Sequence, residues 1–329
     1  MSGSEKYAWV RVTDQAAFPP RDGAGALVYK DAMWLIGGWN PADKTTNPIH
    51  SNCNNEVWNS RDGKQWSLVK PNTHLDNTFD PASDWEARHT AGYVVHRDKM
   101  WIVGGDPLLG HYQSDVWTST DGRSWTRVTD GVPWAPRCLH YTVVHDGRIW
   151  VMGGQPVTKR IQGHVPVWTG PVIEAHYNDV WNSADGVTWQ RVTERAPWAP
   201  RGQIGGAAVK DGRLWILGGG TYYTDSFADV WSSADGIRWE RHTEQAPWRP
   251  RQYHDVAVFD NRLWVLEGVC KPGGNGNDVW CSADGSHWEE VPGTPWAPRH
   301  AASVFVFRDA LWMVAGNHMG RDVWKLVKP

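Results

Sequence analysis

Histidine and carboxylate residues supply the first candidates for chemistry in this chain. Ten of its 14 histidines fall in segments predicted to be loops or strand starts, among them His111, His140, His176 and His254, and Glu174 lies in one of these loops. Imidazole and carboxylate groups bind zinc, iron and copper, and a histidine beside a carboxylate can transfer protons. We therefore expect catalytic roles for His111, His140, Glu174 and His176. We expect His111, His140, His176 and His254 to hold a transition metal (Fe, Cu or Zn), although no closely spaced ligand motif is present.

Arginines form a second candidate set, because one recurs before each of six short apolar segments. They are Arg21, Arg88, Arg137, Arg201, Arg251 and Arg299. Guanidinium groups bind carboxylate and phosphate oxygens in pairs, so we expect Arg137, Arg251 and Arg299 to hold an anionic group of a substrate. The expected binding residues also include Tyr253, Trp168 and Trp39. A structural reading stays open, in which the arginines, and the histidines three residues after two of them, bond neighbouring repeats.

The elements that position these residues belong to an internal repeat of about 50 residues. One repeat shows its parts clearly: an apolar segment at 142–145, the turn Asp146-Gly147, and a second segment at 148–152 that ends at Gly153-Gly154. A loop of variable length then leads to a Val-Trp segment, a Ser-x-Asp-Gly turn and a last segment that begins with Trp. Asp-Gly between apolar runs is typical of a hairpin turn. Each repeat is therefore predicted to be four short strands.

Six such repeats predict a six-bladed β-propeller that occupies residues 1–329 as a single domain. The count rests on six tryptophans at the third strand: Trp58, Trp117, Trp181, Trp231, Trp280 and Trp324. The segment at 7–12 reads as a fourth strand without a preceding blade, and the segment at 323–327 as a third strand without a successor. We expect these two to pair, so that both termini close the last blade. Of the 25 tryptophans, only Trp39 and Trp168 lie outside the repeat.

The order of arginine, turn, aromatic residue and Gly-Gly resembles the kelch repeat, and the resemblance covers essentially the whole chain. It implies a β-propeller. The Asp-Gly turns are too short to build a site, so we expect function on the opposite face, which carries the long loops between the second and third strands. The string at 251–254, Arg-Gln-Tyr-His, resembles one in galactose oxidase, where the adjacent Tyr and His bind copper. Gln203 stands where that family has its radical tyrosine, so the resemblance does not extend to radical oxidase chemistry.

Composition limits the classes of function. Lys and Arg number 33 and Asp and Glu 36, so the net charge is 33 − 36 = −3, which argues against a nucleic-acid-coating protein. No apolar run is long enough for a membrane span, the first residues lack an apolar signal segment, and four cysteines do not form a disulfide framework. We therefore expect a cytoplasmic protein without membrane or nucleic-acid partners.

Taken together, these patterns favour an enzyme that converts a small, anionic molecule in a central pocket on the loop face, with a metal ion as one version of the hypothesis. Two alternatives stay open. One is a kelch module that binds a protein or peptide. The other is a protein that binds acidic sugars or resembles the sialate mutarotases, which share the blade count expected here.

Overall fold

The structure, a computed structural model, describes residues 7–42, 52–75, 77–108, 111–157, 174–202, 206–222, 224–270 and 272–328. Every regular element in these ranges is a β-strand, which confirms the all-β prediction. Within the same ranges, no helix offers the length and apolar character that a membrane span requires.

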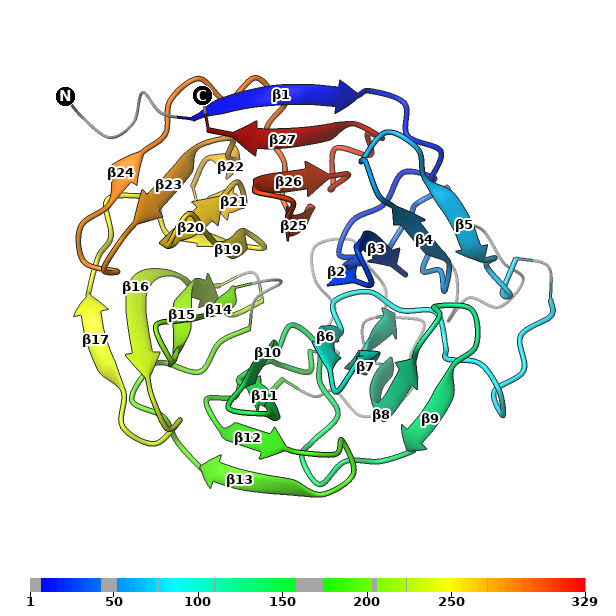
Figure 1. The fold of residues 1–329 in the computed structure, drawn as a ribbon. Coiled ribbons are helices and arrows are strands. Elements are labelled where there is room, and N and C mark those ends of the chain that lie inside the picture. Colours follow the sequence, from blue (N-terminus) through cyan, green and yellow to red (C-terminus); the bar gives the residue numbers. More distant parts are fainter. Residues whose placement is uncertain are drawn as a thin grey trace.

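Antiparallel sheets surround a central axis like the blades of a propeller (Figure 1). Five of them have the predicted four strands. Named from the axis outward, the first two sheets contain β2 (Gly25–Tyr29), β3 (Ala32–Ile36), β4 (Val57–Ser60) and β5 (Ser67–Lys70), and β6 (Gly92–His96), β7 (Lys99–Leu108), β8 (His111–Ser119) and β9 (Thr126–Thr129). The third contains β10 (Tyr141–His145), β11 (Arg148–Met152), β12 (Val180–Ser183) and β13 (Trp189–Thr193). The last two contain β19 (Asp255–Phe259), β20 (Arg262–Leu266), β23 (Val279–Ser282) and β24 (Glu289–Glu290), and β25 (Ser303–Phe307), β26 (Ala310–Val314), β27 (Val323–Val327) and β1 (Ala8–Thr13).

The remaining sheet is larger and curled, and here the structure departs from the expectation of uniform four-stranded blades. It contains β14 (Ala207–Lys210), β15 (Arg213–Gly220), β16 (Ser226–Ser233), β17 (Glu240–Thr243), β18 (Arg251–Gln252), β21 (Val269–Cys270) and β22 (Gly274–Asn275). The first four follow the blade pattern. The additional strands join because β16 is long enough for Phe227 to pair with Arg251 in the segment that leads to the next sheet.

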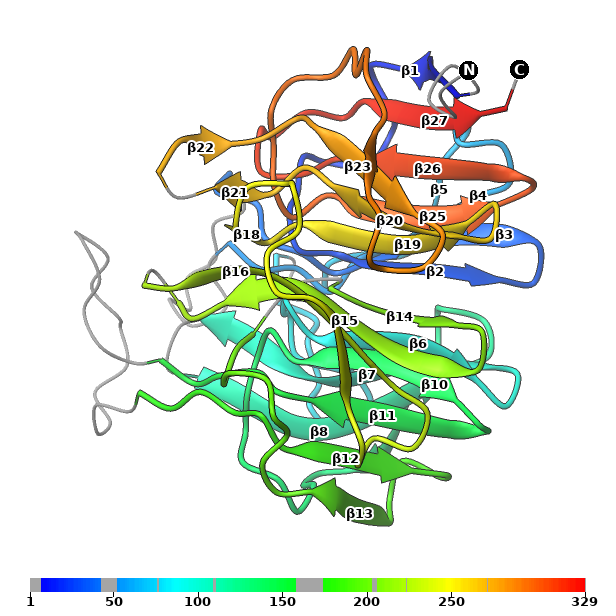
Figure 2. The same cartoon turned by 90° about the vertical axis from the view of Figure 1, so that its left-hand side faces the viewer.

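The first strands of the sheets, β2, β6, β10, β14, β19 and β25, are neighbours of one another in this order around the axis. Figure 2 shows the sheets from the side, with their strands running between the two faces of the propeller. Each first strand begins just after its repeated arginine, so the arginines and the starts of the six inner strands lie at the same face. The site described below is built from these starts.

The two ends of the chain meet, as the sequence predicts. Strand β1 pairs with β27 along its length, and β27 in turn pairs with β26. The ring of Tyr7 lies edge-on to that of Trp264, with 5.0 Å between their centroids. The Tyr7 hydroxyl donates a hydrogen bond of 2.5 Å to Asp260, which also pairs with Lys328 from the other end of the chain. The pairing removes an open sheet edge at this point of the ring.

Tryptophans and tight turns join each sheet to its neighbour. In the turn between β12 and β13, the Ser183 hydroxyl accepts a hydrogen bond from the backbone N–H of Gly186 at 2.8 Å. Gly186 has a φ of +76°, and a Cβ added there would lie 2.5 Å from the ring of Trp101 in β7. The same contact occurs between Gly122 and Trp34 of another pair of sheets. Glycine is therefore needed at these turns for the close approach of the indole as well as for the backbone angle.

Gly186→Ala is expected to destabilise the protein more than Gly147→Ala, which provides a matched control. Both glycines have a positive φ, but a Cβ at Gly147 would meet no atom within 4 Å. The control change carries the backbone penalty alone, about 1 kcal/mol. Gly186→Ala adds overpacking against Trp101, which costs a further ~1–3 kcal/mol. Urea unfolding of both variants measures the difference, and equal losses would contradict an inter-sheet role for this contact.

Candidate functional site

Each repeated arginine is buried in the same hydrogen-bond network. For Arg137, Nε donates to the carbonyl of Ala135 at 3.0 Å, and Nη1 donates to the carbonyl of Gly153 at 2.8 Å. Nη1 and Nη2 also donate to the two carboxylate oxygens of Asp179, at 2.6 and 3.1 Å. The indole of Trp181 donates to the same carboxylate at 2.8 Å. One guanidinium thereby ties the strand start, the Gly-Gly segment and the third strand together.

Four of the other five arginines repeat this arrangement with Asp115, Asp229, Asp278 and Asp322. Arg21 contacts one carboxylate oxygen of Glu56, and Asn54 accepts its other side-chain hydrogen bond. None of the six is more than 1% exposed. The structure therefore places Arg137, Arg251 and Arg299, which we expected to bind an anion, inside ion pairs. Removing such an arginine from its carboxylate would leave a buried charge, so this geometry favours the structural reading of these residues.

Two of the candidate histidines, His140 and His254, hold neighbouring sheets together. His140 Nε2 lies 3.0 Å from the carbonyl of Val103, and His254 Nε2 lies 3.0 Å from the carbonyl of Leu217. A carbonyl can only accept, so the Nε2 atom of each ring carries the hydrogen and has no lone pair for a metal. Burial, with the nearby Arg137 or Arg251, lowers the pKa of both rings to about 3, so they are neutral.

The remaining candidates on the loop face lie apart from these two. His111 is partly buried beside Glu86, with Nε2 3.0 Å from a carboxylate oxygen, and this contact raises the pKa of the ring. Glu174 is exposed and pairs with Val157 through its backbone, while His176 is partly exposed. Among the described residues, no three His, Cys, Asp or Glu side chains are grouped so that they could hold a metal ion. The structure thus does not assemble the four expected ligands into one site.

The aromatic candidates have different surroundings. The ring of Tyr253 lies 5.5 Å from that of His300, and the backbone of Tyr253 has a positive φ of 54°. Trp39 is partly buried, and its backbone pairs with both Asp22 and Cys53. Trp168 falls outside the residues that the structure describes.

A cluster beside Trp39 was not singled out from the sequence. The Cys53 thiol lies 3.6 Å from Nδ1 of His89, and the same nitrogen lies 3.4 Å from a carboxylate oxygen of Asp106. Burial would lower the pKa of His89, but Asp106 and Cys53 outweigh it and raise that pKa well above its usual value. Because both contacts use one ring nitrogen, the cluster is not the relay of a Cys-His-Asp triad, in which the two nitrogens have different partners.

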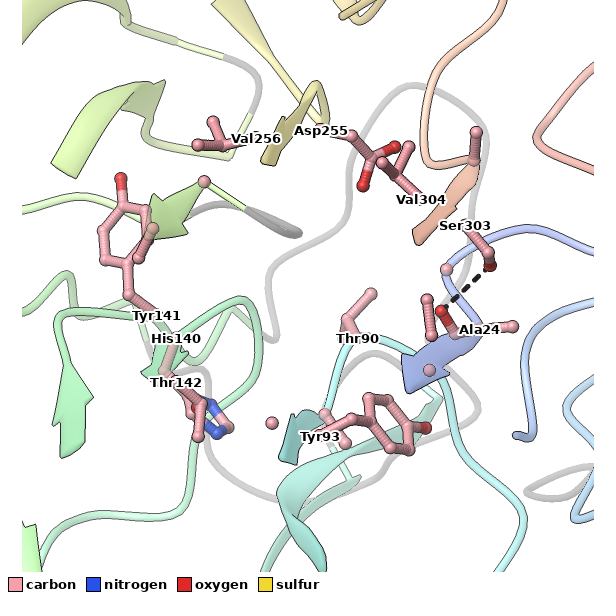
Figure 3. A pocket seen from close by; sticks show the side chains of 18 residues that line it. Ala24, Thr90, Tyr93, His140, Tyr141, Thr142, Asp255, Val256, Ser303 and Val304 are labelled. Carbon is pink, nitrogen blue, oxygen red and sulfur yellow. Dashed lines mark hydrogen bonds between the residues drawn. The ribbon is translucent and has the colours of Figure 1, made fainter. Parts of the chain in front are cut away.

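A cavity of about 170 Å³ lies on the axis of the propeller, at the starts of the inner strands. Glycine, alanine and valine form much of its wall, and Figure 3 shows Asp255 on one side with Tyr93 and Thr142 on the other. His140 also lines it and is the one residue of the expected site found there among the described lining residues. Several buried polar atoms of this wall have no hydrogen-bond partner within the protein: Tyr93 Oη, Thr142 Oγ1, His140 Nδ1 and Asp255 Oδ2. Such atoms need a partner from water or a ligand.

Asp255 interacts with a second buried acid, Glu267. Asp255 is 5% exposed and Glu267 is completely buried, and neither carboxylate oxygen of Glu267 has a hydrogen bond of normal geometry. Burial raises the pKa of Asp255 to about 7. Burial, and then the neighbouring charge of Asp255, raise the pKa of Glu267 well above its usual value. The pair therefore holds protons at a pH where exposed carboxyl groups are ionised.

Neither acid was expected from the sequence, although the repeat carries a signal for each. Four residues after the arginine, where Asp255 stands, other repeats have Gly25, Gly92 or Ser303. At the position of Glu267, four other repeats have the first glycine of Gly-Gly. Glu267 nevertheless adopts a left-handed backbone, with a φ of 50°. Two departures from the repeat that contact each other indicate a local role beyond the fold.

No protein-family model matches this chain, and no curated protein is detectably similar to it in sequence.

Arg137→Met is expected to lower the free energy of unfolding by about 3–5 kcal/mol, because Asp179 would stay buried without its cation. Arg148→Met serves as the control, since its only described hydrogen bond is one of 3.4 Å to Asn182, and we expect a loss below about 1 kcal/mol. Chemical denaturation monitored by tryptophan fluorescence gives both values. A small loss for Arg137→Met would show that this guanidinium is available for a ligand.

Asp255→Asn is expected to stabilise the protein in alkaline solution. A carboxyl whose pKa is raised by folding stabilises the folded state below its unfolded pKa of about 4, and this contribution is lost as the pH rises through the folded pKa. The variant should gain on the order of 1–3 kcal/mol over the natural protein at pH 8 and less at pH 5. Asp146→Asn, at an exposed turn, is the control. An equal gain at both pH values would argue against the raised pKa.

Proposed function

We propose that this protein is a six-bladed propeller of the kelch type that binds and converts a small polar molecule in its central cavity. The observation that carries the proposal is the set of buried, unpartnered polar atoms around that cavity. The repeated arginine networks and the order of the six inner strands support the kelch assignment.

The cavity volume limits the ligand to a small molecule. An apolar protein cavity of about 150 Å³ holds a benzene molecule, so the 170 Å³ here suits a ligand of similar size. Thr142 and His140 line the cavity, and each has a buried polar atom without a hydrogen-bond partner. A ligand that carries hydroxyl or amino groups would supply the missing partners. This chemistry supports a hydroxylated molecule better than an apolar one.

The charge of the cavity bears on the earlier expectation of an anionic substrate. None of the described lining residues is lysine or arginine, and Asp255 contributes an acid. The arginines that would have held an anion are already paired with carboxylates. We therefore propose a neutral or cationic ligand. The peptide-binding, acidic-sugar and metal-dependent versions of the function remain predictions for which no contact among the described residues provides specific support.

Asp255 is also the best candidate for the chemical step. Its pKa of about 7 lets it donate and accept protons near neutral pH, which is the property required of a general acid or base. His140, with a pKa of about 3, would act as a neutral hydrogen-bond acceptor through Nδ1. In this proposal Thr142 orients the ligand, and Asp255 exchanges a proton with it.

A screen of small polyols, amines and carboxylic acids by thermal shift would test the proposal. We expect at least one compound to raise the melting temperature, since binding to the folded state stabilises it. Thr142→Val should weaken its binding about tenfold, because it removes one hydrogen bond, whereas Tyr93→Phe should change the binding little.

Thr126→Val, in the outermost strand β9, is the matched control and should bind the compound unchanged. A compound that binds equally well to all three variants does not occupy the central cavity, and the proposal would then be wrong. The same holds if no compound of this size stabilises the protein.

A further inference from the structure

Asp255, which lines the central cavity, and the neighbouring acid Glu267 occupy positions where most repeats have small residues. Glu267 accepts a left-handed backbone that favours glycine, and both carboxyl groups are buried. A strained backbone and a buried carboxyl group each destabilise a fold. Buried carboxylates are usually paired with a lysine or arginine. The positions of the surrounding cations therefore determine whether the two acids need a positively charged partner from outside the protein.

The nearest arginines do not supply that partner. Arg251 Nη2 lies 2.6 Å from Asp278, and Arg299 Nη2 lies 2.7 Å from Asp322. Arg299 is close enough to Glu267 to lower the pKa of that residue slightly, but burial and Asp255 outweigh it. The other ionisable groups along the described cavity wall are Tyr93, Tyr141 and His140; none of these supplies a cation, since the His140 ring is neutral.

We propose that Asp255, with the buried Glu267 beside it adding negative charge, binds the protonated amino group of a small hydroxylated amine, an inference that rests on the small-molecule function proposed above. Asp255 is the residue of the pair that lines the cavity, and its Oδ2 atom is buried without a partner. Figure 3 shows its carboxylate at the edge of the central space, with Thr142 on the other side. An ammonium group has three N–H donors and one positive charge. It could donate hydrogen bonds to the carboxylate and supply the positive charge that the neighbouring arginines do not provide.

Proton balance gives this binding a characteristic pH dependence. Without a ligand, the pair avoids two buried negative charges by retaining protons. When the ammonium group binds, its N–H groups occupy the carboxylate oxygens, and a proton leaves the pair for solvent. Affinity should therefore rise with pH as long as the ligand stays protonated. The hydroxyl groups of the ligand would meet the opposite wall, where Thr142 lies.

The test compares three probes of one shape and different charge: 3-amino-1,2-propanediol, glycerol and glycerate. We expect the amine to bind at least about tenfold more tightly than glycerol at pH 8, and glycerate more weakly than either. Its affinity should increase about tenfold from pH 5.5 to pH 8. Isothermal titration in two buffers of different ionisation enthalpy should also detect the released proton.

Variants separate this inference from the proposed function. Asp255→Asn and Glu267→Gln should each abolish the preference for the amine over glycerol. Thr142→Val should weaken both probes alike, and Asp146→Asn should weaken neither. Because Asp255→Asn removes a buried charge, the variant is expected to fold.

Several results would overturn the inference. If amine and glycerol bind equally well and both depend on Thr142, the cavity binds small molecules but the acids do not recognise an amine. If sodium, potassium or calcium ions stabilise the protein through Asp255 in place of the amine, the pair is an inorganic cation site. If none of the three probes stabilises the natural protein at millimolar concentration, both the inference and cavity binding of molecules of this size are wrong.

Discussion

The buried pair between a guanidinium and a carboxylate, repeated in every sheet, is the interaction on which the rest of the structure depends. Each pair joins the start of an inner strand to the third strand of its sheet, and it also holds the carbonyl of the Gly-Gly segment. An ion pair of this kind stabilises the fold only if all its donors are used, because burial of charge is costly. Here the backbone carbonyls and an indole N–H complete the network, so the pair fixes the register of the strands.

The same network explains why polar atoms without partners occur on residues around the axis and not at the arginines. The guanidinium groups are surrounded by protein, and the first residues of the inner strands are left to line the cavity. Those residues are small in most repeats, so a single larger or charged side chain changes the cavity without disturbing the neighbouring sheets. Tyr93, Thr142 and Asp255 each use that freedom, and Tyr93 packs closely over Gly25 of the next sheet.

The propeller arrangement and the closure by both termini could be predicted because they depend on repetition. An Asp-Gly turn or a Val-Trp segment has the same local physics in every copy, and copies reinforce one another. The larger, seven-stranded sheet could not be predicted, because it depends on how far β16 extends before it meets Arg251. The residues around the cavity were harder to predict from the sequence, because they come from different sheets and their separation along the chain does not indicate their distance in space. His140 was found by its residue type, whereas Asp255 and Glu267 become visible only as exceptions within aligned repeats.

Ring closure by β1 and β27 also determines the order in which the chain can fold during synthesis. The residues of β1 leave the ribosome first, but their partner β27 is made last, after roughly tens of seconds at ordinary translation rates. Throughout that time β1 is an unpaired strand, and the growing array of sheets has an open edge of the kind that favours aggregation. A chain that stops before Val323 can complete its early sheets but never the last one. Strand β27 therefore completes the last sheet, and a product truncated before this strand would expose unpaired strand edges.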